Sequence, residues 1–396
     1  MTSRVSLLSS TAIAAAAIVF AGASASAASM DALEKRVKAL EKAGAGKSVS
    51  RSKKTMKLTL SGQLHRSVQY VDNGVNTEFR HTQNQSSSTR FRFVGTGKIT
   101  DDVSIRTLFE WENDNGSSPE QGVTIDEKND AIFVERHQDI QITSKSMGKL
   151  YLGHGSEASD GVVYYTDLSG TTVAAGPGNH GLNIGGETFV TSTGAGAGVG
   201  TAEASNLDGG RIDRIRYDTP SFAGFNLNVS HSNQDSQAIA LRYGGSFSGV
   251  RVRATVSYDY DSQSNSGNGA GGGDDTTIGT LGVLLPMGLN FSVNIGQRDF
   301  NTVGAQDLDY QWYKIGYRFK GSELGETRLA AVWTQSEDEG GVDGTTQESW
   351  SANVVQVIEP LGAELWASYT NVEQEVTGVT DIQDIDAVTV GLRVRF

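Results

Sequence analysis

The sequence contains no cysteine among its 396 residues and only 5 prolines. Without cysteine the chain can have no disulfide scaffold, no thiolate nucleophile and no cysteine-based zinc site. The fold must therefore be held together without any contribution from sulfur bridges.

Long apolar runs are also scarce. The longest, TAIAAAAIVFAGA at residues 11–23, is too short to cross a bilayer of ~30 Å as a helix, which takes ~20 residues. It follows Arg4 and precedes Ala25-Ser26-Ala27, which is the order found in cleaved signal peptides. We predict that residues 1–27 are a signal peptide of an exported protein and that the mature chain has no transmembrane helix.

Catalytic and cofactor motifs are absent as well. The histidines show no HExxH pattern and are scattered along the chain, at His65, His81, His137, His154, His180 and His231. The glycine-rich stretches lack the strand-to-helix context of a nucleotide site, and no calcium-binding loop of the EF-hand type is complete. We predict no enzyme activity, no cofactor and no metal site.

A short amphipathic segment follows the signal. Met30, Leu33, Val37 and Leu40 are spaced as the a and d positions of two heptads, and charged residues lie between them. We predict a coiled-coil helix over residues 28–43, in the periplasm, although a single helix resting on the rest of the protein would show the same pattern. Residues 44–55 read as a basic linker rich in Gly and Ser.

Charge is divided unevenly along the chain. Residues 28–57 carry nine Lys or Arg and three Asp or Glu, and Arg4 adds one positive charge, so the net charge of −13 leaves −20 for residues 58–396. A body this acidic is a poor ligand for phosphate backbones, so we expect no nucleic-acid partner.

From residue 56 onward, apolar residues alternate with polar ones at a period of two, which is typical of strands with one apolar face. We count sixteen such segments. Their apolar positions lie within residues 56–70, 91–99, 103–111, 132–142, 150–152, 215–217, 225–229, 239–243, 250–258, 281–283, 289–295, 313–319, 329–333, 350–354, 365–369 and 388–396.

The connections between these segments alternate between short turns, such as residues 100–102, and longer polar loops, such as 72–88 and 113–130. This alternation is typical of outer-membrane barrels, which have short periplasmic turns and long extracellular loops. A soluble β-sandwich would hide its apolar faces inside, and a β-solenoid would need a fixed repeat length, which we do not find. We predict an all-β fold: a 16-stranded antiparallel transmembrane β-barrel over residues 56–396.

One stretch resembles a known family. Residues 214–232 are similar to a strand, turn and strand that recur in Gram-negative trimeric porins; their sequence is RIRYDTPSFAGFNLNVSHS. The resemblance covers roughly residues 56–396. It implies a homotrimer in the outer membrane, in contact with lipopolysaccharide, that forms a passive, water-filled channel for ions and small hydrophilic solutes. A solute-specific channel and a surface adhesin are the alternative functions.

The resemblance also gives the last residue a role. The chain ends in an alternating strand whose final residue is Phe396. A terminal strand of this kind resembles the signal that the outer-membrane assembly machinery recognises. We therefore expect Phe396 to be an assembly signal and that machinery to be a partner.

In this family the third extracellular loop folds into the barrel as a constriction. Here the longest connection spans residues 156–210 and contains six carboxylates but no Lys or Arg. We predict that Glu157, Asp160 and Asp167 reach the constriction, although a loop lying outside the barrel is the alternative. Facing them we expect basic residues of the second and third strands, namely Arg90, Arg92 and Arg106.

Two arginines break the alternation. Arg66 and Arg136 fall at positions that the period assigns to the apolar outer face. An arginine that faces lipid at the bilayer midplane costs ~2–4 kcal/mol. We therefore predict that both lie at a subunit interface together with Gly62, Gly95 and Gly97; a local bulge that turns each arginine inward is the alternative.

Overall fold

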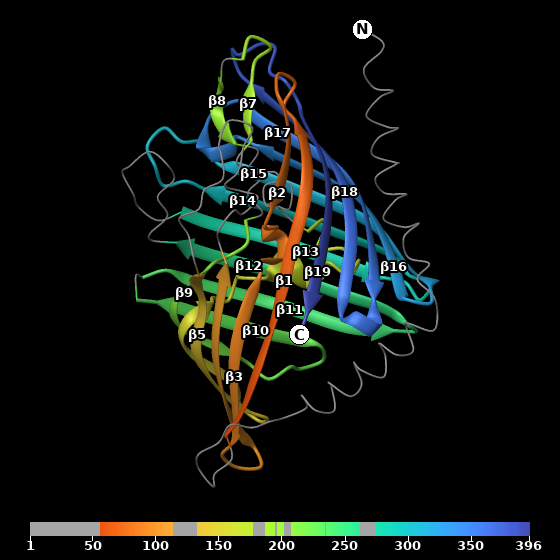
Figure 1. Ribbon diagram of the computed structural model, residues 1–396. Helices are drawn as coiled ribbons and strands as arrows, with labels where there is room; N and C mark the ends of the chain where they lie inside the picture. The colour runs from red at the N-terminus through yellow and green to blue at the C-terminus, as the bar shows by residue number, and fades with distance from the viewer. Residues whose placement is uncertain are drawn as a thin grey trace.

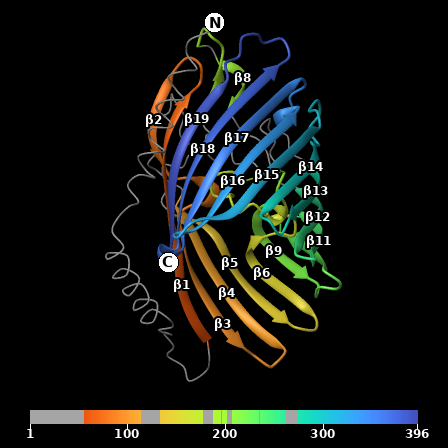
Figure 2. The same ribbon diagram turned by 90° about the vertical axis from the view of Figure 1, so that its right-hand side faces the viewer.

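The computed structural model of the chain describes residues 56–113, 133–176, 187–194, 196–201, 207–233, 235–261 and 274–396. They form one closed antiparallel barrel with strongly tilted strands (Figures 1 and 2). The predicted signal peptide, the coiled-coil helix with Met30, Leu33, Val37 and Leu40, and the linker lie outside these described residues. Within them, no helix is both long enough and apolar enough to cross a membrane.

The barrel strands are β1 (Met56–Asp72), β2 (Thr77–Thr82), β3 (Arg90–Lys98), β4 (Val103–Asn113), β5 (Phe133–Ser144), β6 (Gly148–Ser156), β9 (Arg211–Asp218), β10 (Phe225–Ser232), β11 (Gln237–Phe247), β12 (Val250–Asp261), β13 (Asp274–Leu284), β14 (Leu289–Asp299), β15 (Leu308–Ser322), β16 (Gly325–Glu337), β17 (Thr345–Ile358), β18 (Ala363–Val376) and β19 (Ile385–Arg395). A separate hairpin is made of β7 (Thr188–Val190) and β8 (Gly196–Thr201). The helical turns are η1 (Gln85–Ser87), α3 (Val162–Thr166), η3 (Glu339–Gly341) and η4 (Glu359–Leu361).

From β3 to β19 each barrel strand pairs with the next barrel strand, with β6 joined to β9, and β1 closes the sheet against β19 from Gln63↔Arg395 to Asp72↔Asp386. The strands β2 and β3 pair with two different parts of β1, so together they occupy one position in the barrel. The sixteen predicted strand segments correspond to the sixteen positions. The predicted antiparallel 16-stranded barrel is therefore confirmed.

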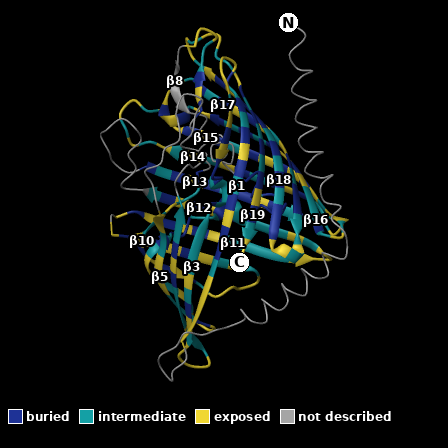
Figure 3. Ribbon diagram, viewed as in Figure 1, coloured by how far each residue is buried: buried dark blue, intermediate teal, exposed yellow. Residues whose placement is uncertain are grey.

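Buried and exposed residues alternate along the barrel strands (Figure 3), and the two faces of the sheet differ in chemistry. On β10, Phe225, Leu227 and Val229 are exposed on the outside, whereas Asn228 and Ser230 are buried inside. The same alternation runs through most strands. An apolar exterior around a polar interior is the arrangement that a barrel needs in a membrane, because lipid surrounds it and polar groups face the lumen.

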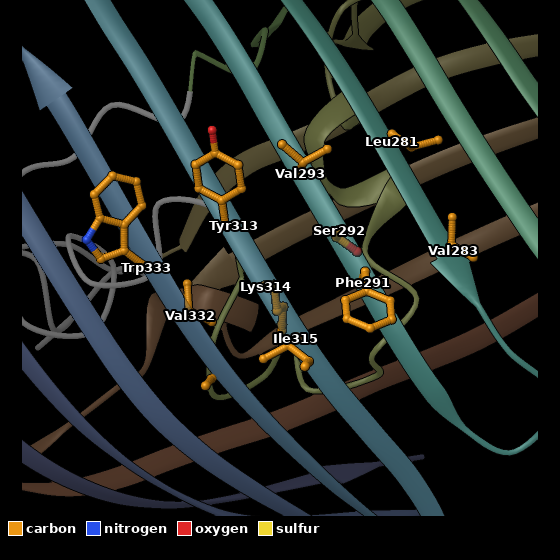
Figure 4. A pocket seen from close by; sticks show the side chains of 11 residues that line it. Leu281, Val283, Phe291, Ser292, Val293, Tyr313, Lys314, Ile315, Val332 and Trp333 are labelled. Carbon is orange, nitrogen blue, oxygen red and sulfur yellow. The ribbon is translucent and has the colours of Figure 1, made fainter.

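The exterior between β13 and β16 shows this face at close range (Figure 4). Phe291, Tyr313 and Ile315 project from the outer face and line a shallow apolar groove of about 420 Å³. Lys314, between Tyr313 and Ile315, has its side chain on the opposite face of the same strand, where it is buried. One strand thus separates an apolar environment from a charged one.

The C-terminal residue completes the closure of the sheet. The Gly62 N–H donates to the Phe396 carbonyl at 2.9 Å, and the Phe396 N–H donates to the Gly62 carbonyl at 3.0 Å. A Cβ atom on Gly62 would lie 2.7 Å from the Phe396 ring. Glycine at this position therefore lets the terminal ring lie directly over β1.

Candidate functional site

The connection between β6 and β9, residues 157–210, lies partly inside the barrel, and its first part follows the inner wall. Arg242 of β11 donates at 3.0 Å to the Ala158 and Asp160 carbonyls. Arg253 of β12 donates to the Tyr165 carbonyl at 3.0 Å. Inward-facing arginines thus satisfy backbone acceptors of a segment that has no sheet partner of its own, as buried backbone requires.

A buried ion pair attaches the same loop farther along. The Lys314 ammonium lies 2.8 Å from the Asp167 carboxylate, and both side chains are fully buried. Lys314 also donates to the Ala175 carbonyl, and the Ser169 N–H and hydroxyl both donate to Asp167. Burial by itself would raise the pKa of Asp167, but the ammonium and the Ser169 donors lower it below its usual value.

The prediction that Asp167 faces the pore is therefore wrong. A carboxylate without solvent exposure that is paired with a lysine of the wall cannot contact passing solutes. The residue instead holds the loop against β15.

Glu157 lies at the beginning of the loop and is also buried. Its carboxyl accepts from the Gly210 N–H, so it joins the two ends of the connection. Burial and the neighbouring Asp259 raise the pKa of Glu157 to about 8. Glu157 thus contributes a hydrogen bond that closes the loop, in a place removed from solvent.

Asp160 is the predicted acidic residue that keeps contact with an arginine near the open lumen. Its carboxylate lies 3.7 Å from Nε of Arg211, whose side chain is 30% exposed. Asp208 accepts from the Gly161 and Val162 N–H groups at 2.9 and 3.0 Å and so fixes the start of α3 beside Asp160. These contacts orient this part of the loop toward β9.

The wall formed by β3, β4 and β5 carries a network of charges centred on Glu110. Arg90 and Arg92 each lie 3.5 Å from this carboxylate, and Arg136 lies 2.9 Å from it. Arg136 also pairs with Glu112 at 2.7 Å. Three guanidinium groups thus share two carboxylates on the inner face.

The predicted place of Arg136 on the outer face is wrong. The register between β4 and β5 shifts after Glu110, which pairs with His137, whereas Trp111 pairs with Glu135. Arg136 is the extra residue between these two pairs. It forms a β-bulge, which turns its side chain into the lumen, where it meets Glu110. The bulge alternative accounts for this arginine.

Arg106 stands apart from this network. It pairs with Thr96 on β3, near the turn at residues 99–102, and is four residues before Glu110 on β4. At a rise of ~3.4 Å per residue, it lies roughly 14 Å along the strand from Glu110. Within the described part of the chain Arg106 makes no ion pair.

The other predicted interface residues lie on the outer face. Arg66 is half-buried between the exposed Leu64 and Val68, and it makes no ion pair or hydrogen bond to any residue that the structure describes. Gly95 and Gly97 leave room for the Met56 side chain, which a Cβ on either glycine would crowd. Gly62 lies beneath Phe396, as described above.

The sequence analysis missed Glu110, Glu112 and Lys314. Each alternates with outward-facing aromatic residues, namely Trp111 beside both glutamates and Tyr313 beside Lys314. The period of two therefore already assigned these charges to the lumen.

Among the described residues, no group of three or more His, Asp or Glu could hold a metal ion.

Comparison with known proteins identifies the family. A family model described as Gram-negative porin matches residues 12–375. The chain belongs to the Gram-negative porin family. It is an outer-membrane channel for passive diffusion, in agreement with its apolar exterior and polar lumen. No curated protein matches the sequence.

Solved outer-membrane proteins share this porin's fold at low sequence identity. The anion-selective porin of Comamonas acidovorans is 14% identical, with a TM-score of 0.57 over 86% of this chain and 100% of that one. The outer-membrane channel DcaP of Acinetobacter baumannii is 11% identical, with a TM-score of 0.57 over 88% and 100%. A trimer form of OmpT from Vibrio cholerae is 13% identical, with a TM-score of 0.52 over 86% and 100%.

The buried ion pair of the loop can be tested directly. Asp167→Asn leaves the Lys314 ammonium buried without a carboxylate, and breaking such a pair costs about 3–5 kcal/mol. We expect the loop to leave the wall, so that open-channel current in planar bilayers becomes noisier and thermal unfolding begins at a lower temperature.

The double variant Asp167→Asn with Lys314→Met is the matched control, because it removes both charges. It should recover most of the thermal stability and much of the quiet current. Quiet current in the single variant, or equal noise in both variants, would contradict a role for this pair in holding the loop.

Proposed function

We propose that solutes cross this porin between the inward loop and the wall of β3, β4 and β5. The observation that carries this proposal is the network of Arg90, Arg92 and Arg136 on the wall, opposite a loop that is held inside the lumen. Asp160 and Arg211 stand at the loop side of the passage. Water and small hydrophilic solutes would pass between the loop and this wall, without a cofactor or a catalytic step.

Opposed charges across a narrow passage favour dipolar and charged solutes, because apolar solutes cannot replace the ordered water there. Purified protein in planar bilayers should show a conductance that rises linearly with salt concentration. A conductance that saturates at low solute concentration would favour a solute-specific channel. The absence of any conductance would favour an adhesin.

Ion selectivity tests which charges line the passage. Replacing Arg90 and Arg92 with Gln should shift the reversal potential in a salt gradient toward cation preference, and Asp160→Asn should shift it toward anion preference. Both shifts follow from removing one sign of charge beside the permeating ion.

The double variant Asp167→Asn with Lys314→Met serves as the control for selectivity, because both charges are buried and cancel. Its reversal potential should equal that of the wild type. If the arginine and Asp160 variants also leave the reversal potential unchanged, the passage lies elsewhere in the lumen.

We also propose a homotrimer whose contact includes the outer face of β1 and β3, with Arg66, Gly62, Gly95 and Gly97. Arg66 supports this contact, because it is half-buried, it has no partner among the residues that the structure describes, and an unpaired guanidinium on the apolar exterior would be unfavourable in lipid. The trimer form recorded for the related OmpT fold agrees with it. The segment at residues 28–43 would then bring three amphipathic helices together as a coiled coil.

Arg66 and Arg136 form a matched pair for testing the contact. Arg66→Glu should lower the temperature at which the trimer dissociates in detergent and leave single-channel conductance unchanged. Arg136→Glu should change conductance, because this side chain lies in the lumen. An unchanged dissociation temperature for Arg66→Glu would remove this residue from the interface.

We propose a second role for the C-terminus. Phe396 would be the signal read by the outer-membrane assembly machinery on a chain exported by the signal peptide of residues 1–27, and the folded barrel would lie among lipopolysaccharide. Deleting Phe396 should leave export intact but deplete heat-modifiable protein from the outer membrane. Normal amounts of folded protein there would show that the residue is not needed as a signal.

A further inference from the structure

The second barrel position is interrupted in the middle of the wall. β1 pairs with β3 up to Gln63↔Arg90 and with β2 from Ser67↔Thr82 onward. The short stretch 64–66 of β1 therefore faces the longer stretch 83–89, which leaves the sheet. We call residues 83–89 the inward turn; it contains the helical turn η1.

Side chains on the inner face of β1 hold the inward turn in the lumen. The Gln63 amide donates to the Ser87 and Ser88 carbonyls at 3.0 and 2.8 Å. The His65 ring contacts the Ser87 carbonyl at 3.0 Å through Nδ1. The Thr89 hydroxyl accepts from the His65 N–H at 3.0 Å and thus replaces part of the missing ladder.

The inward turn touches the long loop inside the lumen, on the side of β17 and β18. The Ser86 hydroxyl donates to the Val173 carbonyl at 2.6 Å. Val173 packs with Val355 of β17 and Trp366 of β18 in one buried cluster. Trp366 donates to Nε2 of His65 at 2.8 Å, so the cluster is continuous with the residues that hold the turn.

Burial divides the lumen into two sectors. In the sector of β17, β18 and β1, the side chains of Val355, Trp366 and His65 are no more than 1% exposed. In the sector of β3 and β9, the side chains of Arg92 and Arg211 are 42% and 30% exposed. The three side chains named in the first sector are covered by protein. In the second sector Arg92 and Arg211 remain partly exposed, although Arg214 and Arg216 of β9 are buried.

The inward turn also adjoins the charge network. Arg90 follows it directly and donates from Nε to the Ser88 carbonyl at 3.1 Å. The Ser88 hydroxyl donates to Glu112, the carboxylate that pairs with Arg136. The turn thus positions two charged groups of the wall in addition to covering part of the lumen.

We propose that the inward turn is a second constriction element of this porin. Together with residues 171–175 of the long loop, it closes the side of β17, β18 and β1 and confines solutes to the arginine-rich side of β3 and β9. This inference rests on the proposed function, because it concerns the route through the same pore. If the inward turn has this role, its residues Ser86, Ser87 and Ser88 determine the width and the selectivity of the pore.

Removal of residues 84–87 tests the proposal. The deletion leaves Gln83, Ser88 and Thr89 opposite residues 64–66 of β1, so the second strand can run without interruption. Because pore diameter governs passage, we expect single-channel conductance to rise roughly twofold. Removal of residues 302–305, from the exposed loop between β14 and β15, is a control of equal length and should leave conductance unchanged.

Cysteine accessibility identifies the route independently, because the chain has no native cysteine. Arg92→Cys should react with a membrane-impermeant anionic methanethiosulfonate and lose current. Ser368→Cys, next to Trp366 on the inner face of β18, should not react. When the Ser368→Cys change is combined with the deletion of 84–87, the same cysteine should become reactive.

The outcomes separate this inference from the proposed function. A wild-type protein without conductance would overturn the proposed function. A conducting wild type in which the deletion leaves conductance unchanged, or in which cysteine at 368 reacts as fast as cysteine at 92, would overturn only the second constriction. If the deletion variant does not fold, the two cysteine positions in the full-length chain still give the answer.

Discussion

Every backbone N–H and C=O group of a segment that crosses lipid must find its hydrogen-bond partner inside the protein, because hydrocarbon offers none. In this porin the pairing of β1 with β19 meets that requirement for the two strands that would otherwise be edges. The hydrogen bonds between Gly62 and Phe396 extend the pairing to the last residue of the chain. The apolar exterior, the polar lumen and the position of the long loop all depend on this closure.

Closure leaves a lumen that has to be shaped by segments without a place in the sheet. Their backbone groups need partners too, and the inner face supplies them with charged side chains. Arg242 and Arg253 donate to loop carbonyls, and Lys314 pairs with Asp167 beneath the loop. A buried ion pair contributes little net stability, but removal of one partner is costly, so such pairs select one loop position over others.

The inward turn follows the same rule on the opposite side. Gln63 and Thr89 replace the sheet hydrogen bonds that β1 loses where β2 and β3 separate. One break in the wall thus provides a segment that reaches Val173 on the long loop. Two inward segments, each held by polar residues of the wall, determine where open space remains.

Most of the fold was predictable from the sequence. The period of two marked all sixteen barrel positions, and the boundaries of the long connection at residues 156–210 agree with the end of β6 at Ser156 and the start of β9 at Arg211. These features are local, because a strand with one lipid face must alternate over its whole length. The same alternation also assigns Glu110 and Lys314 to the lumen.

The positions that the sequence did not reveal depend on single-residue shifts and distant partners. A bulge after Glu110 reverses the direction of Arg136 without disturbing the overall pattern. The stretch 72–88 read as one polar loop, whereas the structure divides it into β2 and the inward turn. Asp167 was predicted to reach the constriction, because its partner Lys314 lies 147 residues away in the sequence and the pairing is not visible there. The sequence by itself determined the barrel and its two faces, because alternation is local. Only the tertiary structure decided which charges face water, because that depends on pairing across the lumen.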